Sequence, residues 1–260
     1  MNEANMSWAL VTGATGGLGE QFCHQLAARG YALVLHGRDE ARLERLASAL
    51  ANSGTDVRIA PADLSRPDGA AELVRKVDAL GIEPDLLVNN AGFGYAAEFA
   101  SSDLARQRAL LQVNVTSLTE LCGTYAGRMA KRRSGAILNV ASVAGVMPGP
   151  YMSTYYASKA YVLSLSQALH EELAPAGVEV LAVCPGPVRT GFWDVAGTNT
   201  SGRNAFMLAP EEVCRIALVA LERDRAVCAP GLVSKACYAF GRSMPGLVAR
   251  KVCAQFNRIK

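Results

Sequence analysis

Near the start of the chain stands the stretch WALVTGATGGLG, residues 8–19. Its first four residues form an apolar run that is typical of a buried strand. Gly13, Gly17 and Gly19 follow, and a helical pattern opens at the second of them. Glycines in this position allow a tight turn and close backbone approach to a pyrophosphate, which the N–H groups of the helix N-terminus would bind. The stretch therefore predicts a dinucleotide-binding turn; the alternative is a tight strand–helix turn without a ligand.

The rest of the chain repeats this alternation of short apolar runs and longer segments of helical period. We expect strands at residues 8–11, 32–35, 57–60, 86–88, 136–140, 178–184 and 226–229. Helices are predicted at residues 17–28, 39–51, 70–80, 104–131, 151–173 and 210–222. Near-continuous apolar strands are typical of a parallel sheet covered by helices on both faces. The chain is thus predicted to be an α/β protein with a doubly wound parallel sheet of about seven strands.

One domain is expected over residues 1–260, because no repeat or linker interrupts the alternation. Residues 187–208 are rich in Gly, Thr, Asn and Ser, and are predicted to form a mobile loop over the site. Half of the residues are apolar and the mean hydropathy is +0.15. This composition favours a thick core together with a large apolar subunit interface.

The net charge, the N-terminal sequence, the length of the apolar runs and the cysteine pattern each argue against a class of protein. A net charge of +3 is too small to indicate nucleic acid binding. The N-terminus lacks the pattern of a signal peptide, and no apolar run approaches the ~18 residues of a membrane span. The seven cysteines are odd in number and contain no C-x-x-C pair. Reduced thiols in a cytoplasmic protein are therefore expected, with no metal site. His24, His36 and His170 are scattered and are interpreted as structural.

The end of the second predicted strand bears on cofactor choice. An acidic side chain there would bind the adenosine ribose and repel a 2′-phosphate. The sequence has Gly37 at this place and Arg38 directly after it. A charge-assisted contact to phosphate contributes about 1.5–3 kcal/mol, so NADP(H) is predicted over NAD(H). The alternative is that Arg38 is solvated or paired with Asp39 or Glu40.

Two further turns follow predicted strands. Asp63 and Leu64 follow the third strand, where the carboxylate could cap the next helix or hold the adenine amino group. Asn89-Asn90-Ala91-Gly92 follows the fourth strand, and its small and amide side chains suit close approach to a ribose. Taken alone, that tetrapeptide is only a turn signal.

An acid–base pair is predicted on the helix at residues 151–173. Tyr155 and Lys159 are four residues apart and so share one helix face. A cation about 5 Å from the phenol, at an effective dielectric of about 20, favours the phenolate by about 3 kcal/mol. This predicts a phenol pKa below its ordinary value of about 10, although burial acts in the opposite direction. Ser142 could donate to the substrate oxygen. Tyr156 is the competing tyrosine, with less suitable spacing.

Six motifs in this order give the chain its resemblance to the short-chain dehydrogenase/reductase superfamily, in its single-domain branch. They are TGxxxGxG at Thr12–Gly19, NNAG at Asn89–Gly92, Asn114, Ser142, YxxxK at Tyr155–Lys159, and Pro185-Gly186-Pro187-Val188-Arg189-Thr190. The resemblance covers about residues 7–222, and it is strongest to the DltE-like or general ketoreductase group. Ala141 and Leu64 depart from the common pattern without affecting the chemistry.

The resemblance implies a Rossmann-type fold and a defined set of site residues. Asn114 would anchor a water in a proton relay through Lys159, and Val188 and Thr190 would hold the nicotinamide carboxamide. A homodimer or homotetramer built on the long helices is also implied. The residues expected to bind the cofactor are Gly13, Thr15, Gly16, Gly17, Leu18, Gly19, Arg38, Asp63, Leu64, Asn90, Ala91, Gly92, Tyr155, Lys159, Pro185, Gly186, Val188 and Thr190.

Together these features predict an NADP(H)-dependent oxidoreductase that interconverts a ketone or aldehyde and an alcohol, with Tyr155 as acid and base. Alternatives are an epimerisation or dehydration on the same scaffold, or a non-catalytic module that senses NAD(P). Phe93, Tyr95, Phe192 and Trp193 are expected either to line an apolar substrate pocket or to pack in the core.

The C-terminal segment at residues 230–260 is basic and helical in pattern. It contains six cations and no acidic residue. Three interpretations stay open: a terminal helix packed on the body with solvated cations, peripheral contact with an anionic membrane, or docking of an acidic protein such as an acyl carrier protein.

Overall fold

The computed structural model describes residues 6–197 and 206–258. Its centre is a seven-stranded sheet in the order β3-β2-β1-β4-β5-β6-β7, and every neighbouring pair is parallel. The strands are β1 Trp8–Val11, β2 Ala32–Leu35, β3 Val57–Ile59, β4 Leu86–Asn89, β5 Gly135–Val140, β6 Val178–Val183 and β7 Val227–Cys228. The predicted doubly wound parallel sheet is confirmed.

Strand order reverses beside β1, which lies between β2 and β4. Leu10 of β1 is in register with Val34 of β2 on one side and Leu87 of β4 on the other. The chain winds outward from β1 to β3 and then returns to form β4 on the opposite side of β1. A crevice forms at the carboxyl ends of the strands where such a reversal occurs, and ligands bind there in open α/β sheets.

Helices cover both faces of the sheet. The α-helices are α1 Gly17–Ala27, α2 Glu40–Ala51, α3 Gly69–Ala79, α4 Leu104–Leu111, α5 Leu118–Arg132, α6 Ser153–Leu173, α7 Phe192–Ala196, α8 Pro210–Leu221, α9 Gly231–Ser243 and α10 Gly246–Asn257. Shorter helical turns are η2 Phe99–Ser101, the π-helical turn η3 Gln112–Ser117, η4 Val143–Val146 and η5 Ala174–Ala176.

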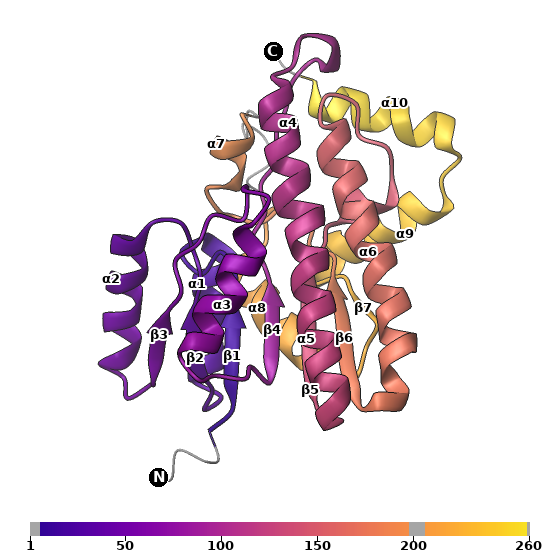
Figure 1. Cartoon of the computed structure of the whole chain (residues 1–260). Coiled ribbons are helices and arrows are strands. Elements are labelled where there is room, and N and C mark those ends of the chain that lie inside the picture. Colours follow the sequence, from indigo (N-terminus) through magenta and orange to yellow (C-terminus); the bar gives the residue numbers. More distant parts are fainter. Residues whose placement is uncertain (1–5, 198–205, 259–260) are drawn as a thin grey trace.

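Alternate residues along each strand face opposite helical layers. Leu10 packs with side chains of α3, α5 and α6, whereas Ala9 and Val11 pack with α1, α2 and α8. In Figure 1 the layer with α5 and α6 stands in front of the sheet. The apolar strand sequences follow from this arrangement, because neither face of the sheet meets water.

Three expectations about individual elements are corrected by the structure. The long helix at residues 104–131 contains a π-helical turn and ends at Arg132. The helix expected from Tyr151 begins at Ser153, because Tyr151 itself has a φ of 66°. The segment at residues 187–208 is not only a loop: it contains α7, and Val188 pairs with Leu208 in an isolated bridge. Residues 198–205 of that segment lie outside the described residues.

The basic C-terminal segment forms two helices rather than one. α9 ends at Ser243, and Pro245 caps α10, since proline cannot continue a helix. Figure 1 shows α7 and α10 toward the end of the molecule away from the N-terminus, with α9 at about mid-height.

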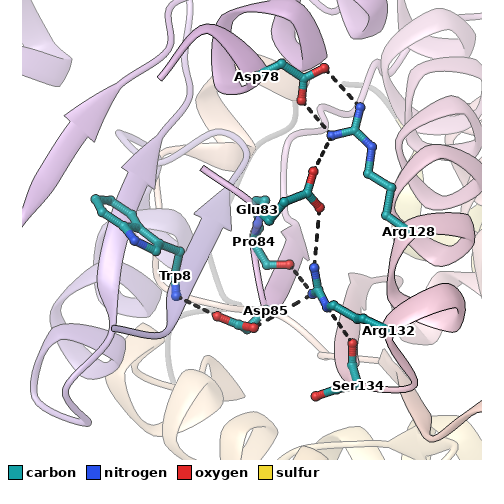
Figure 2. A network of polar contacts seen from close by, with 8 residues as sticks. All are labelled: Trp8, Asp78, Glu83, Pro84, Asp85, Arg128, Arg132 and Ser134. Carbon is teal, nitrogen blue, oxygen red and sulfur yellow. Dashed lines mark hydrogen bonds and ion pairs between the residues drawn. The ribbon is translucent and has the colours of Figure 1, made fainter. Parts of the chain in front are cut away.

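A polar network ties the opposite end of the sheet together. Figure 2 shows Arg128 and Arg132 of α5 reaching Asp78 of α3 and the segment Glu83–Asp85 that enters β4. Asp85 also accepts a hydrogen bond from the backbone N–H of Trp8, where β1 begins. These contacts lie at the amino ends of the strands, so they stabilise the layer packing without touching the crevice.

In the described part of the chain, no helix combines the length and apolar character needed to cross a membrane. All seven cysteines are free and six are buried, as expected.

Candidate active site

A cavity of about 1090 Å³ occupies the crevice at the carboxyl ends of the strands. At one end it is lined by the glycine turn and the end of β2, and at the other by α9 and α10. Between them lie Ser142, Tyr155 and Lys159. The cavity therefore brings the predicted cofactor turn and the predicted acid–base residues into one site.

The glycine turn has the geometry of a cradle for a phosphate group. Gly13 has a φ of 63°, a conformation that favours glycine. A Cβ on Gly19 would lie 2.1 Å from the carbonyl oxygen of Gly13, so only glycine fits there. Gly16 is the N-cap of α1, and no side chain caps this helix. Its first N–H groups therefore face the cavity end without a side-chain acceptor, which fits the pyrophosphate of a dinucleotide.

Thr12 and Asn90 lock this turn to the end of β4. The Thr12 hydroxyl accepts hydrogen bonds from the N–H groups of Asn90 and Ala91 at 3.0 Å each. The Asn90 amide donates to the carbonyl oxygens of Thr12 at 2.9 Å and of Gly13 at 3.0 Å. The NNAG turn is therefore part of the cradle.

His36 lies buried beneath the turn. Its Nδ1 accepts the N–H of Gly13 at 3.3 Å, and its Nε2 lies 3.2 Å from the carbonyl oxygen of Ala62. Burial lowers the pKa of His36 to about 4, so the ring is neutral near pH 7. A neutral ring with its proton on Nε2 satisfies both contacts, which is consistent with the predicted structural role.

Two arginines mark the cavity wall beyond β2. Arg38 lines the cavity as expected, and Arg42 of α2 lines it too. The Arg42 guanidinium donates to the carbonyl oxygen of Thr15 at 2.8 Å. Asp39 does not oppose them directly, because its carboxylate caps α2 by accepting from the N–H of Arg42 at 3.0 Å. Arg42 was not predicted as a site residue, although a cation four residues after Arg38 is visible in the sequence.

Asp63 lines the cavity as well, and among the described residues it is the one acidic side chain that does so. Its carboxylate accepts hydrogen bonds from the N–H and hydroxyl of Ser65, at 3.0 and 2.7 Å. Burial acts to raise the pKa of Asp63, but the Ser65 hydrogen bonds and the charge of Arg38 leave the pKa below its ordinary value. The carboxylate is thus ionised and held in place at neutral pH.

The predicted acid–base residues stand at the centre of the cavity wall. Tyr155, Lys159 and Ser142 are all buried. The Ser142 hydroxyl accepts the N–H of Ala144 at 3.1 Å and also interacts with the Tyr155 hydroxyl. The Lys159 ammonium donates to the carbonyl oxygen of Val140 at 2.7 Å and lies 5.9 Å from the centre of the Tyr155 ring. Ser142, Tyr155 and Lys159 therefore line the cavity together.

The direction of the phenol's pKa differs from the sequence expectation. Burial raises the pKa of Tyr155 above its ordinary value, and the hydrogen bond with Ser142 opposes this only in part. Burial also lowers the pKa of Lys159 to about 8. The expected lowering of the phenol pKa by Lys159 is wrong for the protein alone, because desolvation of the hydroxyl outweighs the distant cation.

Asn114 lies in the π-helical turn and is 1% exposed. Its side-chain oxygen accepts the N–H of Phe93 at 3.1 Å. Its amide donates to the carbonyl oxygen of Phe93 and to the Ser158 hydroxyl, both at 3.1 Å. A Cβ added to Gly92 would meet the Asn114 oxygen at 3.0 Å and the Lys159 ammonium at 3.5 Å. Asn114 is thus a neighbour of Lys159 behind the cavity wall.

All but one of the remaining predicted cofactor residues line the cavity. Gly19 lies beneath the cradle and the others line the cavity: Gly13, Thr15, Gly16, Gly17, Leu18, Leu64, Asn90, Ala91, Gly92, Pro185, Gly186, Val188 and Thr190. A Cβ on Gly17 would lie 2.6 Å from Thr190, so these two segments meet.

Three of the four predicted substrate residues line the cavity: Phe93, Phe192 and Trp193. The Phe192 ring lies 5.3 Å from the Tyr155 ring, measured between centroids. Tyr95 is not among the residues that line the cavity; it packs against the buried cluster that contains Met152 and Tyr155. Its hydroxyl accepts the N–H of Asp103 at 3.2 Å, and the Arg106 guanidinium lies 4.6 Å from its ring centre. Of the two interpretations of Tyr95, the structure favours packing.

The C-terminal helices contribute a wall that sequence analysis did not foresee. Residues of α9 and α10 line the cavity beyond Tyr155: Ala236, Cys237, Phe240, Val252, Cys253, Phe256 and Asn257. This end of the cavity is predominantly apolar. Among the described residues, no group of three or more His, Cys, Asp or Glu side chains could hold a metal ion.

Comparisons with known proteins give matches over most of the chain. The family model for the short chain dehydrogenases matches residues 7–200. The chain is 37% identical over 201 residues to nodulation protein G of Rhizobium sp. (strain N33), a match that spans 77% of this chain and 80% of that protein. It is also 35% identical over 198 residues to a very-long-chain 3-oxoacyl-CoA reductase of Podospora anserina, covering 74% of this chain and 58% of that protein.

The fold is shared with a solved short-chain dehydrogenase from Sphingobium yanoikuyae in complex with NADPH. The TM-score is 0.80 at 34% sequence identity, and the match covers 92% of this chain and 97% of that one.

Proposed function

The chain belongs to the short-chain dehydrogenase family of NAD(P)-dependent oxidoreductases, and from this premise we propose that it interconverts a ketone or aldehyde and an alcohol with NADP(H), using Tyr155 as acid and base. The observation that carries the proposal is the shared cavity. Tyr155, Ser142 and Lys159 line it together with the glycine cradle. The relative that is named as a 3-oxoacyl-CoA reductase supports a carbonyl substrate.

We propose NADP(H) over NAD(H) because the cavity wall after β2 is cationic. Arg38 and Arg42 line it, and the carboxylate of Asp39 is turned into the helix cap. An anionic 2′-phosphate would gain charge-assisted hydrogen bonds from these guanidinium groups. The solved NADPH complex of a similar protein supports the same choice.

The proposed chemistry assigns a separate task to each residue. The bound nicotinamide supplies or accepts the hydride. Tyr155 gives its proton to the carbonyl oxygen in reduction, and its raised pKa keeps that proton in place at neutral pH. Ser142 donates to the same oxygen, which stabilises the charge that develops there. Lys159, with a pKa of about 8, supplies positive charge near the phenol below that pH. Asn114 would hold a water that takes part in a proton relay through Lys159.

Replacing Tyr155 by Phe tests the proposal directly. The substitution removes the acidic proton but keeps the ring that packs against Phe192. Turnover of a carbonyl panel with NADPH should fall at least about 100-fold, the usual contribution of general acid catalysis. NADPH affinity, measured by fluorescence titration, should be retained. Tyr161→Phe on the same helix is the control, since Tyr161 is 40% exposed and outside the cavity. Unchanged turnover in Tyr155→Phe would refute the role.

Two rival functions give different results in the same assay. An epimerase or dehydratase would convert substrate without net oxidation of NADPH, which the absorbance of the cofactor reports. A binding module would hold NADPH and turn over no carbonyl of the panel. The reductase is favoured because the phenol of Tyr155 and the hydroxyl of Ser142 line the same cavity, and neither is needed for binding alone.

The assembly and location of the protein are also proposals. Homodimers or homotetramers through the long helices are supported by exposed apolar side chains there, such as Leu104, Leu111 and Tyr161. A cytoplasmic location is supported by the seven free thiols. Peripheral contact with an anionic membrane through the C-terminal segment is supported by its cations, which include the exposed Lys235 and Lys251.

A further inference from the structure

We propose that α9 and α10 bind an extended apolar arm of the substrate, so that the protein prefers carbonyl compounds with long apolar substituents to short ones. The inference rests on the proposed function, because it concerns the substrate of the same cavity. It adds the class of compound and the residues that select it.

The first observation is that three apolar side chains line the cavity and remain accessible to solvent. Phe240 of α9 and Val252 and Phe256 of α10 line the cavity. They are 38%, 46% and 50% exposed. Since they line the cavity, part of its wall is apolar surface that no other protein group covers. An apolar part of a ligand in the cavity can bury this surface.

The second observation is the spacing along α10. Val248, Val252 and Phe256 are four residues apart and so form one strip along the helix. We call these three residues the α10 strip. At 1.5 Å per residue, the strip extends for about 12 Å. Val248 is 41% exposed, so the strip runs from the cavity wall out along the helix. A linear apolar group that leaves the cavity at Phe256 would find a continuous apolar surface to lie against.

The third observation is that α10 is held in a fixed orientation. Ala249, Cys253 and Asn257 alternate with the strip and are buried against the body. The Asn257 side chain accepts the Tyr156 hydroxyl at 3.4 Å and donates to the carbonyl oxygen of Pro150 at 3.3 Å. Tyr156 directly follows Tyr155, the proposed acid, in the sequence. These contacts of Asn257 therefore fix the position of the α10 strip relative to Tyr155.

A second copy of the chain fits this surface less well than a substrate arm. From Pro230 onward the sequence has cations and no acidic residue. A symmetric contact would bring together two copies of a surface that carries Arg250 and Lys251 and no acidic residue, and the like charges would repel. An uncharged apolar arm meets no such repulsion.

The experiment compares chain-length dependence in the full-length protein and three variants. Reduction of 2-alkanones from butanone to dodecanone is measured with NADPH. Val252→Asp and Phe256→Asp place a charge on the strip, at exposed positions where the fold tolerates it. Phe99→Asp is the matched control, because Phe99 is 63% exposed and does not line the cavity. A second readout follows the binding of 1-alkanols by the fluorescence of Trp193, a cavity residue, in a Trp8→Phe background.

In the parent protein, kcat/KM should rise with chain length, by at most about fourfold per buried methylene. Alkanol affinity should rise in parallel. Both strip variants should flatten these slopes relative to their own values for butanone. Phe99→Asp should keep the parent slopes, the parent turnover of butanone and the parent KM for NADPH.

The outcomes separate the inference from the proposed function. If ketones are reduced but rate and affinity do not depend on chain length, or if the strip variants keep the parent slopes, the inference is wrong and the function stands. If no ketone is reduced but alkanol affinity rises with length and falls in the strip variants, the function is wrong and the arm site stands. A strip variant that changes only the oligomeric mass in sedimentation would show a subunit interface instead.

Discussion

At the scale of single residues, the proposed preference for NADP(H) rests on the groups that follow β2. Gly37 has no side chain, Arg38 lines the cavity, and Asp39 is occupied in capping α2. Arg42 is also fixed by its bond to the Thr15 carbonyl oxygen. A guanidinium that is already fixed loses less side-chain entropy when it binds a phosphate. More of its interaction free energy with the phosphate therefore appears as affinity for NADPH.

We therefore expect Arg38→Ala and Arg42→Ala each to raise the KM for NADPH by about ten- to a hundredfold, which corresponds to about 1.5–3 kcal/mol. The KM for NADH should change little, because NADH has no 2′-phosphate. Arg45→Ala on the same helix is the control, since Arg45 is exposed and does not line the cavity. Equal losses for NADPH and NADH would show that the arginines act on the turn and not on the phosphate.

At the scale of secondary structure, the sheet and its covering helices were predictable because each strand is an uninterrupted apolar run. The cradle, Ser142, Tyr155 and Lys159 were found for a similar reason, since their motifs occupy fixed places at strand and helix ends. The π-helical turn was not predictable, because its sequence QVNVTS has an ordinary helical pattern. The placement of α10 depends on contacts such as that between Asn257 and Tyr156, about a hundred residues apart in the chain, which local periodicity does not encode.

The π-helical turn leads to a prediction about Asn114. Its three hydrogen bonds join the turn to the Phe93 backbone and to α6, and replacing it by Ala leaves buried partners unsatisfied. Asn114→Ala should lower the free energy of unfolding by about 1–3 kcal/mol and reduce turnover as Lys159 loses its support. Urea denaturation measures the first effect and NADPH oxidation the second. Thr119→Val, in α5 shortly after the turn, should cost less, because the Thr119 hydroxyl bonds at a partly exposed site. Equal stability of Asn114→Ala and the parent would contradict the argument.

At the scale of the whole molecule, the two ends of the sheet have separate tasks. The carboxyl ends of the strands carry the cavity, and the amino ends carry the network of Figure 2. Arg128 is the centre of that network: it binds both oxygens of Asp78, at 2.6 and 3.0 Å, and Glu83 at 2.9 Å. It joins α3 to α5 and so closes one helical layer over the sheet. A change here should affect stability and leave the active site intact.

Arg128→Gln should therefore destabilise the protein without changing kcat. The Arg128 hydrogen bonds hold the pKa of Asp78 below its ordinary value. Asp78 is 43% exposed, so solvent screening limits the loss to about 1 kcal/mol. Because the folded-state pKa is depressed, this stabilisation is present above about pH 4, the unfolded value, and disappears as the pH falls through the folded value. The urea midpoints of parent and variant should thus differ at pH 7, and the difference should be smaller at pH 3. Arg215→Gln, which breaks only an exposed pair within α8, should shift the midpoint less at pH 7. A gap of the same size at both pH values would mean that Arg128 acts through its packing against Tyr125 and not through its charge.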